Sequence, residues 1–498
     1  SSNIMYAGAG YSEWEIGDID VFQYQGVYHL FHLIIPNHDY IAHAISSDGI
    51  SWKRVNNALF VGHPGAWDDD MLWTMHAAIY RHKFHLFYTG LSLRDKGIMQ
   101  RVGVATSDDL MQWDKVTDEQ FPVQSEAPYY EDLNNNPRQW LSFRDPFFYS
   151  DKDRDFLFVC ARAAEGPMSR RGCVAALELI DDQIVSHPPI LYPRMYDDVE
   201  CPCVFKINDI YYLLGSIRED IKVRYWFSKE LLGEYHSFHS DVLLPKGNYA
   251  ARVVKDNGHW LIFNFYFMGN TVNIKRVLPP PKQLDVDANG RLFLKSYYRW
   301  DMMVLSILEQ SDFPVPRKLL ENPTSELKIL EEGWMLQNRS GYELFHMISP
   351  TSSFIWEGKI RVVGLGKCGL MCDLDEEGNG YFIPFDVVNG YVSIRVWGSN
   401  PQNPKEDFIF TDLQSNLYKV NDDLTFDFRL IRYGHYFELS VNGVVRLTLI
   451  DYTFSASGFG LYSSSSEIYL NKSRLKALPE PISEYASLDN VDVSGNGL

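Results

Sequence analysis

The sequence predicts an all-β protein made of a five-bladed β-propeller followed by a C-terminal β-sandwich. A turn followed by an aromatic-rich apolar strand recurs five times in the first 270 residues, and apolar spacing typical of amphipathic helices is almost absent there. Beyond residue 327, short alternating segments continue without that repeat. The repeat indicates propeller blades, and its loss indicates a second all-β unit.

The repeated element is a turn-like pair of residues that leads into an apolar strand, at intervals of roughly 50 to 70 residues. That interval fits blades of about four short strands, in which a hairpin turn precedes one central strand. Because the innermost strands of a propeller converge on one axis, side chains far apart in the sequence can meet at one mouth of the channel. The copies begin at Gly26, His82, Asp153, Asn208 and Asn257.

The propeller is predicted over residues 1–305, where the blade pattern fades. The stretch that follows contains Pro314, Pro316 and Pro323 together with a charged, helical-looking segment. Proline interrupts both helices and central strands, so this composition predicts a linker at residues 306–326.

The sandwich is predicted over residues 327–480, from short strands with alternating apolar residues. One of them, Tyr436–Val441, runs into Asn442-Gly443, which is a strong signal for a two-residue hairpin turn. Residues 481–498 are rich in Ser, Asp, Asn and Gly and predict a loosely ordered tail.

Charge and hydropathy exclude several classes of partner. The net charge of −19 argues against nucleic acid and against an anionic membrane surface, so a small neutral ligand fits better. No run of apolar residues is long enough to span a membrane, and Ser1-Ser2-Asn3 does not begin a basic and then apolar signal region. We therefore expect a cytoplasmic protein, with secretion after removal of a signal as the alternative.

The cysteines are too sparse for a disulfide scaffold, and we expect them to be reduced, buried thiols. Cys368 and Cys372 have the spacing of a metal half-site, but no matching pair of cysteines or histidines stands nearby. The sequence predicts no metal site and no cofactor. The six cysteines are Cys160, Cys173, Cys201, Cys203, Cys368 and Cys372.

Three acidic residues occupy comparable places in different blades: Asp18, Asp145 and Glu200. A single one of them would most simply be a residue that caps a turn or faces solvent. Three in comparable places predict a shared pocket. Cleavage of a glycosidic bond needs one carboxylic acid to protonate the leaving oxygen and a second carboxylate to attack the anomeric carbon or activate water.

Two motifs around these acids resemble glycoside hydrolase family 32, the family of invertases and fructanases. They are Phe143-Arg144-Asp145-Pro146 and Glu200-Cys201-Pro202, and Tyr28–Phe31, Leu86–Gly90 and Ala42–Asp48 support the resemblance. The resemblance covers nearly the whole chain and implies a five-bladed propeller with a sandwich. It also implies a retaining mechanism in which Asp18 is the nucleophile, Glu200 is the acid and base, and Asp145 holds substrate hydroxyls.

The sequence departs from the family pattern around the expected sugar pocket. The segment around Asp18 is shorter than in the family, which leaves Asp20 as a rival nucleophile. Leu33 and Ile41 stand where the family usually has Gln and Trp, and the segment Trp73–Ala77 also differs. Because loss of hydrogen-bonding groups changes which hydroxyls are accepted, we expect an atypical sugar.

Further residues are candidates for substrate binding. Arg144 accompanies Asp145, and Arg252 lies in a segment that resembles the fifth-blade motif of the family. His43 and His76 would bind sugar or be buried, satisfied histidines, and Trp73 would stack on a sugar ring or belong to the core. Asp20 completes the set.

The sequence thus predicts a β-fructofuranosidase-like hydrolase that acts on a terminal furanoside of a small carbohydrate and needs no nucleic acid or membrane partner. A homodimer remains open. Three alternatives remain: an arabinofuranosidase or xylosidase similar to family 43, whose short Asp-x-Asp-Val start resembles Asp18–Val21; a fructosyl transferase; and a carbohydrate-binding protein without turnover.

Overall fold

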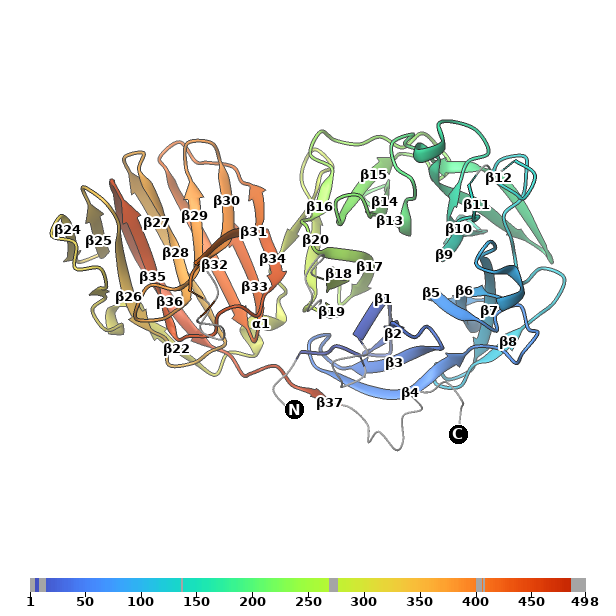
Figure 1. Cartoon of the computed structure of the whole chain (residues 1–498), viewed down its shortest axis with the longest axis horizontal. Helices are drawn as coiled ribbons and strands as arrows, with labels where there is room; N and C mark the ends of the chain where they lie inside the picture. The colour runs from blue at the N-terminus through green and yellow to red at the C-terminus, as the bar shows by residue number, and fades with distance from the viewer. Residues whose placement is uncertain are drawn as a thin grey trace. The chain divides into compact units, whose positions relative to one another are not determined.

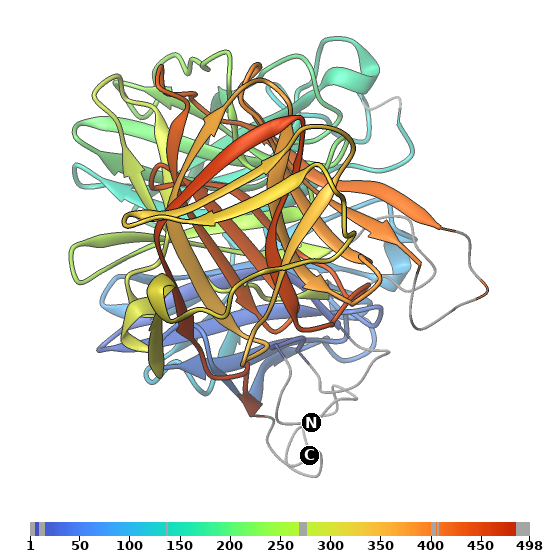
Figure 2. The same ribbon diagram turned by 90° about the vertical axis from the view of Figure 1, so that its left-hand side faces the viewer.

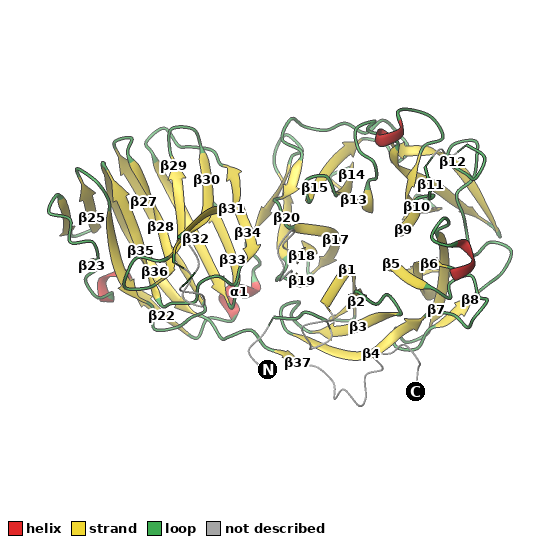
Figure 3. Ribbon diagram, in the orientation of Figure 1, coloured by secondary structure: helices red, strands yellow, loops and turns green. Residues whose placement is uncertain are grey.

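The computed structural model describes residues 5–8, 15–135, 138–267, 276–399, 405 and 408–484. The chain divides into two compact units: one is Ile4–Leu292 together with the segment that starts at Ile482, and the other is Phe293–Pro481. Almost all of the regular structure is strand, with a few short helical turns (Figure 3). Within the described part of the chain, no helix has the length and apolar character needed to cross a membrane.

In its described residues, the first unit contains five antiparallel sheets whose first strands face a common centre, so the predicted five-bladed propeller is confirmed (Figure 1). The first blade consists of β1 (Glu15–Tyr24), β2 (Val27–Ile35), β3 (Tyr40–Ser46) and β4 (Trp52–Phe60), and the second of β5 (Met71–Tyr80), β6 (Lys83–Leu91), β7 (Arg101–Ser107) and β8 (Asp114–Val116). The third consists of β9 (Phe143–Asp151), β10 (Arg154–Arg162), β11 (Gly172–Ile180) and β12 (Gln183–Leu191), and the fourth of β13 (Glu200–Ile207), β14 (Ile210–Ile217), β15 (Lys222–Ser228) and β16 (Val242–Leu244). The fifth consists of β17 (Asn248–Asp256), β18 (His259–Phe267), β19 (Arg276–Val277), β20 (Lys282–Val286) and β21 (Leu292–Lys295), and short helical turns lie at η1 (Leu93–Asp95) and η2 (Met168–Arg170).

The five repeated turns of the sequence connect the first and second strands of the five blades. In each turn both central residues have positive φ, the geometry of a type I′ hairpin, which Gly26 and Gly258 adopt without steric cost. The second strand of every blade is therefore the aromatic-rich repeat. The hairpins close at the pairs Tyr24 with Val27, Tyr80 with Lys83, Asp151 with Arg154, Ile207 with Ile210, and Asp256 with His259.

A β-bulge interrupts the first strand of each blade. In all five, the inner strand contains one more residue than the stretch of the second strand that it pairs with. A bulge bends the strand and re-aims the side chains next to it. The bulges fall between Ile16 and Ile19, Trp73 and Met75, Arg144 and Phe147, Glu200 and Cys203, and Tyr249 and Arg252.

Aromatic contacts hold neighbouring blades together. Phe87 of β6 stacks on Phe148 of β9 at a centroid distance of 5.6 Å, inside a buried cluster that joins the second and third blades. Another buried cluster joins the first and second blades around Phe31 and Leu86. The aromatic-rich second strands thus supply the packing that keeps the inner strands in place.

In the described residues of the second unit, two sheets form the predicted sandwich, whose strands are yellow to red in Figure 2. One sheet contains β22 (Ser306–Glu309), β24 (Ser325–Ile329), β25 (Gly333–Asn338), β27 (Phe354–Val363), β32 (Thr425–Tyr433), β33 (Tyr436–Val441), β34 (Val444–Ile450) and β36 (Ser466–Ala477). The other contains β23 (Arg317–Lys318), β26 (Glu343–Ile348), β28 (Lys367–Leu374), β29 (Gly380–Asp386), β30 (Tyr391–Gly398), β31 (Ile409–Leu417) and β35 (Gly458–Ser464). Short helical segments lie at α1 (Arg299–Met302) and η3 (Gln310–Asp312), and the fully buried Trp356 packs edge-on against Phe428 and Phe459.

Residues 306–326 are not a separate linker, which corrects the boundaries expected from the sequence. β22 pairs with β36, β23 pairs with β26, and β24 pairs with β25. The prolines separate short edge strands of the sandwich, where a missing backbone donor costs no ladder hydrogen bond. The expected helical-looking segment is β24, and the sandwich unit begins at Phe293 instead of residue 327.

The expected tail also begins differently. Ser483 and Glu484 form β37, which runs parallel to β4 at the edge of the first blade. Residues 485–498 lie outside the described residues.

Candidate active site

Asp18, Asp145 and Glu200 line one cavity of about 530 Å³ in the propeller unit. They come from β1, β9 and β13, the first strands of three blades. Each acid thus belongs to the inner strand of its blade. The cavity is lined by Gly17, Asp18, Leu33, Ile35, His38, Trp73, Thr74, Gly97, Gln100, Trp140, Arg144, Asp145, Asp198, Glu200, Arg218, Ile221, Tyr249, Phe265, Phe267 and Arg276.

The bulges create this convergence. Asp145 and Cys201 lie at bulges and have positive φ angles of 60° and 49°, a conformation that non-glycine residues adopt rarely. This backbone lets the amide of Cys201 donate a hydrogen bond to Oδ2 of Asp145 at 2.9 Å. The two residues with a strained backbone, Asp145 and Cys201, are therefore hydrogen-bonded within the acidic cluster. Such strain is common at functional sites.

Asp145 is buried and held on several sides. Its own amide donates to Oγ1 of Thr89 at 3.0 Å, and Nε of Arg144 lies 3.9 Å from its Oδ2. Burial raises the pKa of Asp145 to about 6, the charges of Asp18 and Glu200 add to the rise, and Arg144 opposes it. The carboxyl group thus stays close to the point of changing its charge near neutral pH.

Asp18 accepts a hydrogen bond from the hydroxyl of Thr74, and the thiol of Cys201 lies 3.5 Å from its Oδ2. Burial raises the pKa of Asp18, and the charge of Glu200 raises it further. The two carboxyl groups are therefore close enough to influence each other's ionisation. Asp18 therefore retains a proton more readily than an exposed aspartate does.

Glu200 has donors on both of its oxygens. The hydroxyl of Tyr249 donates to Oε1 at 2.6 Å, and Nη2 of Arg144 donates to Oε2 at 3.1 Å. Nε of Arg218 lies 3.4 Å from Oε1. Arg144 is fixed in turn by Asp198, whose Oδ2 lies 3.1 Å from the same Nη2.

The sequence model described as the glycosyl hydrolases family 32 N-terminal domain matches residues 18–256, a range that starts at Asp18 and contains all three acids. The chain belongs to glycoside hydrolase family 32. By class it is a glycoside hydrolase.

Solved structures share the fold of the family 32 chain over nearly its whole length. They include the sucrose-6-phosphate hydrolase of Lactobacillus gasseri, at a TM-score of 0.69 and 14% identity, which covers 96% of this chain and 94% of that chain. The fructan 1-exohydrolase IIa of Cichorium intybus has a TM-score of 0.69 and 13% identity, with coverage of 97% and 98%. The exo-inulinase of Aspergillus awamori has a TM-score of 0.68 and 12% identity, with coverage of 96% and 98%. A search of curated protein sequences found no match.

Asp20 does not line the cavity, although it lies two residues from Asp18 on the same strand. It is buried and paired with Nε of Arg252 at 3.0 Å and with Nδ1 of His76 at 3.1 Å, and it accepts a hydrogen bond from the amide of Ala77 at 2.8 Å. The expected substrate contacts of Asp20, His76 and Arg252 are therefore corrected: these residues form a buried ionic cluster that joins blades.

His43 is likewise outside the cavity. Its ring stacks on Phe31 at 4.4 Å and lies 2.9 Å from the ring of His29. Burial, followed by the charges of His29 and Arg54, holds the pKa of His43 well below its usual value, so the ring stays neutral. Of the two interpretations of His43, a buried histidine or a sugar contact, its surroundings support the buried histidine.

Arg144 and Trp73 line the cavity. The fifth-blade segment also contributes, but through Tyr249 and not through Arg252. The bulge between these two residues breaks the alternation of side chains along β17, so that counting from the motif selects the wrong one.

Sequence reasoning missed Asp198, Arg218 and Arg276. Asp198 stands two residues before Glu200, a spacing that places both on one face of an extended chain and could have identified it. The two arginines lie outside any motif, and nothing in their sequence context marks them.

Asp18, Asp145 and Cys201 present three atoms within 4.8 Å of one another, a spacing that could accommodate a cation. Burial, then the charges of Asp145 and Asp18, raises the pKa of the Cys201 thiol well above its usual value. A thiol that retains its proton is a poor metal ligand and a competent hydrogen-bond donor. We interpret Cys201 as a donor to the two acids.

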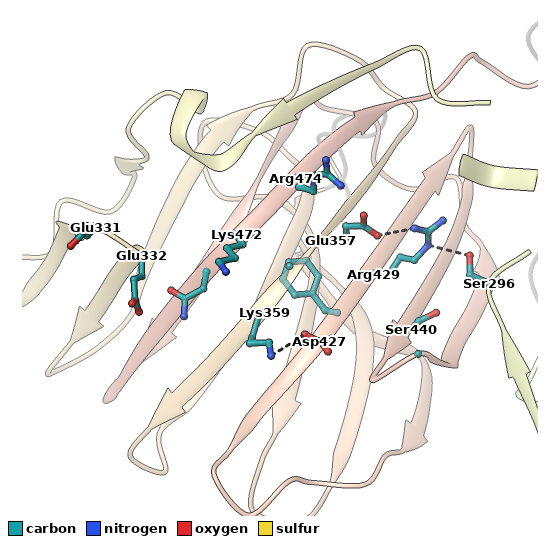
Figure 4. A pocket seen from close by; sticks show the side chains of 14 residues that line it. Ser296, Glu331, Glu332, Glu357, Lys359, Asp427, Arg429, Ser440, Lys472 and Arg474 are labelled. Carbon is teal, nitrogen blue, oxygen red and sulfur yellow. Dashed lines mark hydrogen bonds and ion pairs between the residues drawn. The ribbon is translucent and has the colours of Figure 1, made fainter. Parts of the chain in front are cut away.

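A larger cavity, of about 880 Å³, lies in the sandwich unit along β27, β32 and β36 (Figure 4). Four of its charged side chains pair with one another: Glu357 lies 2.7 Å from Arg429, and Lys359 lies 3.8 Å from Asp427. Glu357 and Asp427 are thus held by cations and are not a pair of free carboxyl groups of the kind that acid and nucleophile chemistry needs.

Proposed function

We propose that this family 32 protein is a retaining hydrolase that releases a terminal β-fructofuranosyl residue from a small carbohydrate. The observation that carries the proposal is the convergence of Asp18, Asp145 and Glu200 on one cavity of about 530 Å³. A cavity of this size accommodates the end of a carbohydrate, which supports action on a terminal residue.

The first step assigns a role to each of two acids. Asp18 attacks the anomeric carbon through a carboxylate oxygen, while Glu200 gives its proton to the glycosidic oxygen, and the bond between that carbon and oxygen breaks. In the second step Glu200 takes a proton from water. The water oxygen bonds to the anomeric carbon, the ester to Asp18 breaks, and two inversions leave the configuration unchanged.

The electrostatics of the acid pair suit these roles. The first step requires one ionised and one protonated carboxyl group, and Asp18, whose pKa is raised by burial and by the charge of Glu200, lies in an environment that favours a proton in the acidic cluster. The charge of Glu200, which raises the pKa of Asp18, supports this state. Substrate binding must leave the proton on Glu200, beside the leaving oxygen.

Asp145 and Arg144 complete the site. We assign Asp145 to the hydroxyl groups of the terminal sugar, whose hydrogen bonds strengthen as positive charge develops at the anomeric carbon. Arg144 orients Glu200 through its 3.1 Å contact.

Relatives with the same fold favour a fructoside. The fructan 1-exohydrolase of Cichorium intybus was solved in complex with 1-kestose, and the β-fructofuranosidase BmSUC1 of Bombyx mori was solved in complex with sucrose. The cavity wall of this chain contains Leu33 beside Trp73. An apolar group at this wall lowers the affinity for a hydroxyl that needs a partner there, which supports an atypical fructoside.

The test is release of sugar from a panel of fructosides, arabinofuranosides, xylosides and galactosides by the wild type, Asp18→Asn and Glu200→Gln. We expect cleavage of fructosides, loss of nearly all turnover in both variants, and a first product that keeps its anomeric configuration by NMR. Asp209→Asn is the matched control, because its side chain is 99% exposed on a hairpin turn. Cleavage of another class alone, or an inverted product, contradicts the proposal.

A further inference from the structure

The sandwich unit contains another cavity, on the sheet in which β28, β29 and β30 lie side by side (Figure 1). Its volume is about 800 Å³, and all of its lining residues belong to the sandwich unit. We call it the trough, and its lining includes Phe382, Arg395, Trp397 and Tyr462. The reaction proposed above uses residues of the propeller unit, so the trough has no part in that chemistry.

The trough lies on the face of its sheet that points away from the other sheet. On β29, Tyr381 packs against Phe437 of the other sheet at a centroid distance of 4.6 Å, so Tyr381 faces the interior of the sandwich. Successive side chains of a strand point to opposite faces, and the next residue, Phe382, therefore faces outward. Outward positions in a sandwich are usually polar, so an aromatic side chain here calls for a partner.

The floor of the trough is a buried apolar cluster that extends across neighbouring strands. Tyr462 of β35 meets Phe382 of β29 edge-on at a centroid distance of 5.3 Å, although β28 lies between these two strands. The contact depends on Gly369 of β28, where a Cβ atom would lie 2.6 Å from Cε1 of Tyr462. The cluster consists of Leu344, Met371, Leu374, Phe382 and Tyr462. The floor is thus formed by packing within the sheet and exists before any ligand binds.

Trp397 adds an exposed aromatic ring to the trough. Arg395 stands directly opposite Phe382 on β30, and Trp397, two residues further along that strand, lies on the same face. Trp397 is 41% exposed, and the exposed side chains of Leu365 and Val388 line the same cavity. Exposed apolar side chains that gather at one cavity, instead of being scattered, indicate a binding surface.

The hydroxyl group of Tyr462 indicates what kind of ligand would bind. It has no hydrogen-bond partner among the described residues, although Tyr462 is only 6% exposed and lines the trough. Burial raises the pKa of Tyr462 well above its usual value, so the hydroxyl keeps its proton and remains a donor. A buried donor without a partner is unfavourable, and a ligand with oxygen acceptors would satisfy it.

The charges at the trough balance one another. Its lining contains the cations Lys367 and Arg395 and the anions Glu377 and Asp386. The Nε atom of Arg395 also lies 3.1 Å from Oδ1 of Asp412. In a chain with a net charge of −19, this local balance favours neither an anionic nor a cationic ligand.

We propose that the trough is a binding site for an uncharged oligosaccharide. The exposed ring of Trp397 stacks on the apolar C–H face of a sugar ring, and the hydroxyl of Tyr462 donates to a sugar oxygen. A purely apolar ligand would leave that hydroxyl unpaired, and a charged ligand would meet no net opposite charge. The inference does not rest on the proposed function, because every residue that carries it belongs to the sandwich unit.

Calorimetry on the full chain tests the trough with four probes: an inulin-type oligofructoside, cellohexaose, xylohexaose and the uncharged apolar dye N-phenyl-1-naphthylamine. Asp18→Asn is the background of every variant, so that no fructoside is consumed during the titration. We expect at least one oligosaccharide to bind in the trough, and Trp397→Ala to weaken this binding at least about 10-fold. Tyr462→Phe removes only the hydroxyl and should weaken it by about 3- to 10-fold.

Tyr391→Ala is the matched control. Tyr391 belongs to the same strand as Trp397, is 40% exposed and does not line the trough, so its loss should leave the binding unchanged. An oligofructoside that also occupies the propeller cavity should give two binding events, of which Trp397→Ala removes one. Thermal unfolding of each variant verifies that it is folded.

The outcome is independent of the proposed reaction. If fructosides are not cleaved but an oligosaccharide binds in a manner that depends on Trp397 and Tyr462, the trough stands and the proposed reaction fails. If fructosides are cleaved and no oligosaccharide binds outside the propeller cavity, the reaction stands and the trough is wrong.

Three further results would overturn the inference. The first is oligosaccharide binding that is equal in Trp397→Ala, Tyr462→Phe and Tyr391→Ala. The second is tighter binding of the dye than of every oligosaccharide, unaffected by Tyr462→Phe, which would make the ligand an apolar molecule. The third is a dimer in sedimentation velocity that Trp397→Ala dissociates, which would make this face an interface between two copies of the chain.

Discussion

Two aspartates on β1, only two residues apart, have opposite surroundings. Asp20 is buried among Arg252, His76 and a backbone amide, so that its charge is fully compensated. Asp18 faces the cavity, where its charged neighbour is Glu200, and its donors are a hydroxyl and a thiol. The same residue type on the same strand is structural in one cluster and available for chemistry in the other.

The two aspartates differ in how neighbouring groups compensate the carboxylate charge, and burial alone does not explain the difference. A buried carboxylate whose oxygens are occupied by an arginine, a histidine and a backbone amide is not available to attack a carbon atom. A carboxylate beside a second acid in a place with little water has a raised affinity for protons and shares one with its neighbour. We name the first group, Asp20, Arg252 and His76, the ionic cluster, and the second, Asp18, Asp145 and Glu200, the acid cluster.

The largest effect that the comparison predicts is on turnover. Asp18→Asn should reduce kcat on every fructoside by about 10⁴-fold or more, because no other group supplies the covalent intermediate. Glu200→Gln should lose as much on natural substrates but much less on a nitrophenyl fructoside, whose leaving group needs no proton. Burst kinetics with the nitrophenyl substrate measure the first step directly.

If both variants respond to the activated leaving group alike, the two roles are not divided between Asp18 and Glu200 as proposed. Asp20→Asn is the informative comparison. If Asp20 were the nucleophile, this variant would lose turnover on both the natural and the nitrophenyl fructoside without losing stability.

The next effect is on stability. Asp20→Asn leaves the buried Arg252 without its carboxylate, which should cost about 3–5 kcal/mol of unfolding free energy. Asp18→Asn should cost little or stabilise the fold, because it removes a charge that burial and Glu200 both oppose. Urea denaturation at pH 7, followed by near-ultraviolet circular dichroism, measures both.

The double variant Asp20→Asn with Arg252→Met sharpens this test. It removes both charges and should recover part of the lost stability. A double variant that is as unstable as the sum of the single ones would mean that the two residues do not act as a pair.

The architecture could be predicted from the sequence because the turns are local. Asn257-Gly258 and the equivalent pairs favour type I′ hairpins by their own backbone preferences, and the aromatic strands after them have a regular period. Asp145 and Glu200 could be found for the same reason, since each stands next to a proline-containing motif that needs no knowledge of distant residues.

The members of the site that depend on bulges could not be predicted. A bulge shifts the alternation of side chains by one residue, so that Tyr249 lines the cavity while Arg252 is buried under it in the ionic cluster. Arg218 and Arg276 line the same cavity only because the fold brings the fourth and fifth blades to it, and their separation in sequence contains no sign of that. The pairing of Asp20 with Arg252 is of the same kind: it joins the first and fifth blades.

A smaller effect concerns pH and Asp145. The pKa of Asp145 is raised from 3.8 to about 6, mainly by burial, so the folded state binds its proton more tightly than the unfolded state does. The stability that this provides is fully present below pH 3.8 and is lost as pH rises through 6, an effect of up to about 3 kcal/mol.

Asp145→Asn should therefore gain stability relative to the wild type as pH increases from 4 to 7. Urea midpoints of the two proteins across this range measure the difference. A constant difference would mean that Asp145 is ionised throughout, and that Arg144 compensates its charge more completely than burial opposes it.

The smallest effect is expected from Cys201, which connects the acid cluster through its thiol. Its Sγ lies 3.5 Å from Asp18 and 3.6 Å from Asp145, and its raised pKa keeps it protonated, so it can donate to only one of them at a time. Cys201→Ala removes a weak donor and should lower kcat/KM by about 2- to 10-fold, whereas Cys201→Ser should retain more activity. Because the backbone amide of residue 201 still donates to Asp145 in both variants, a loss far larger than this would mean that the thiol itself holds Asp18 in position for attack.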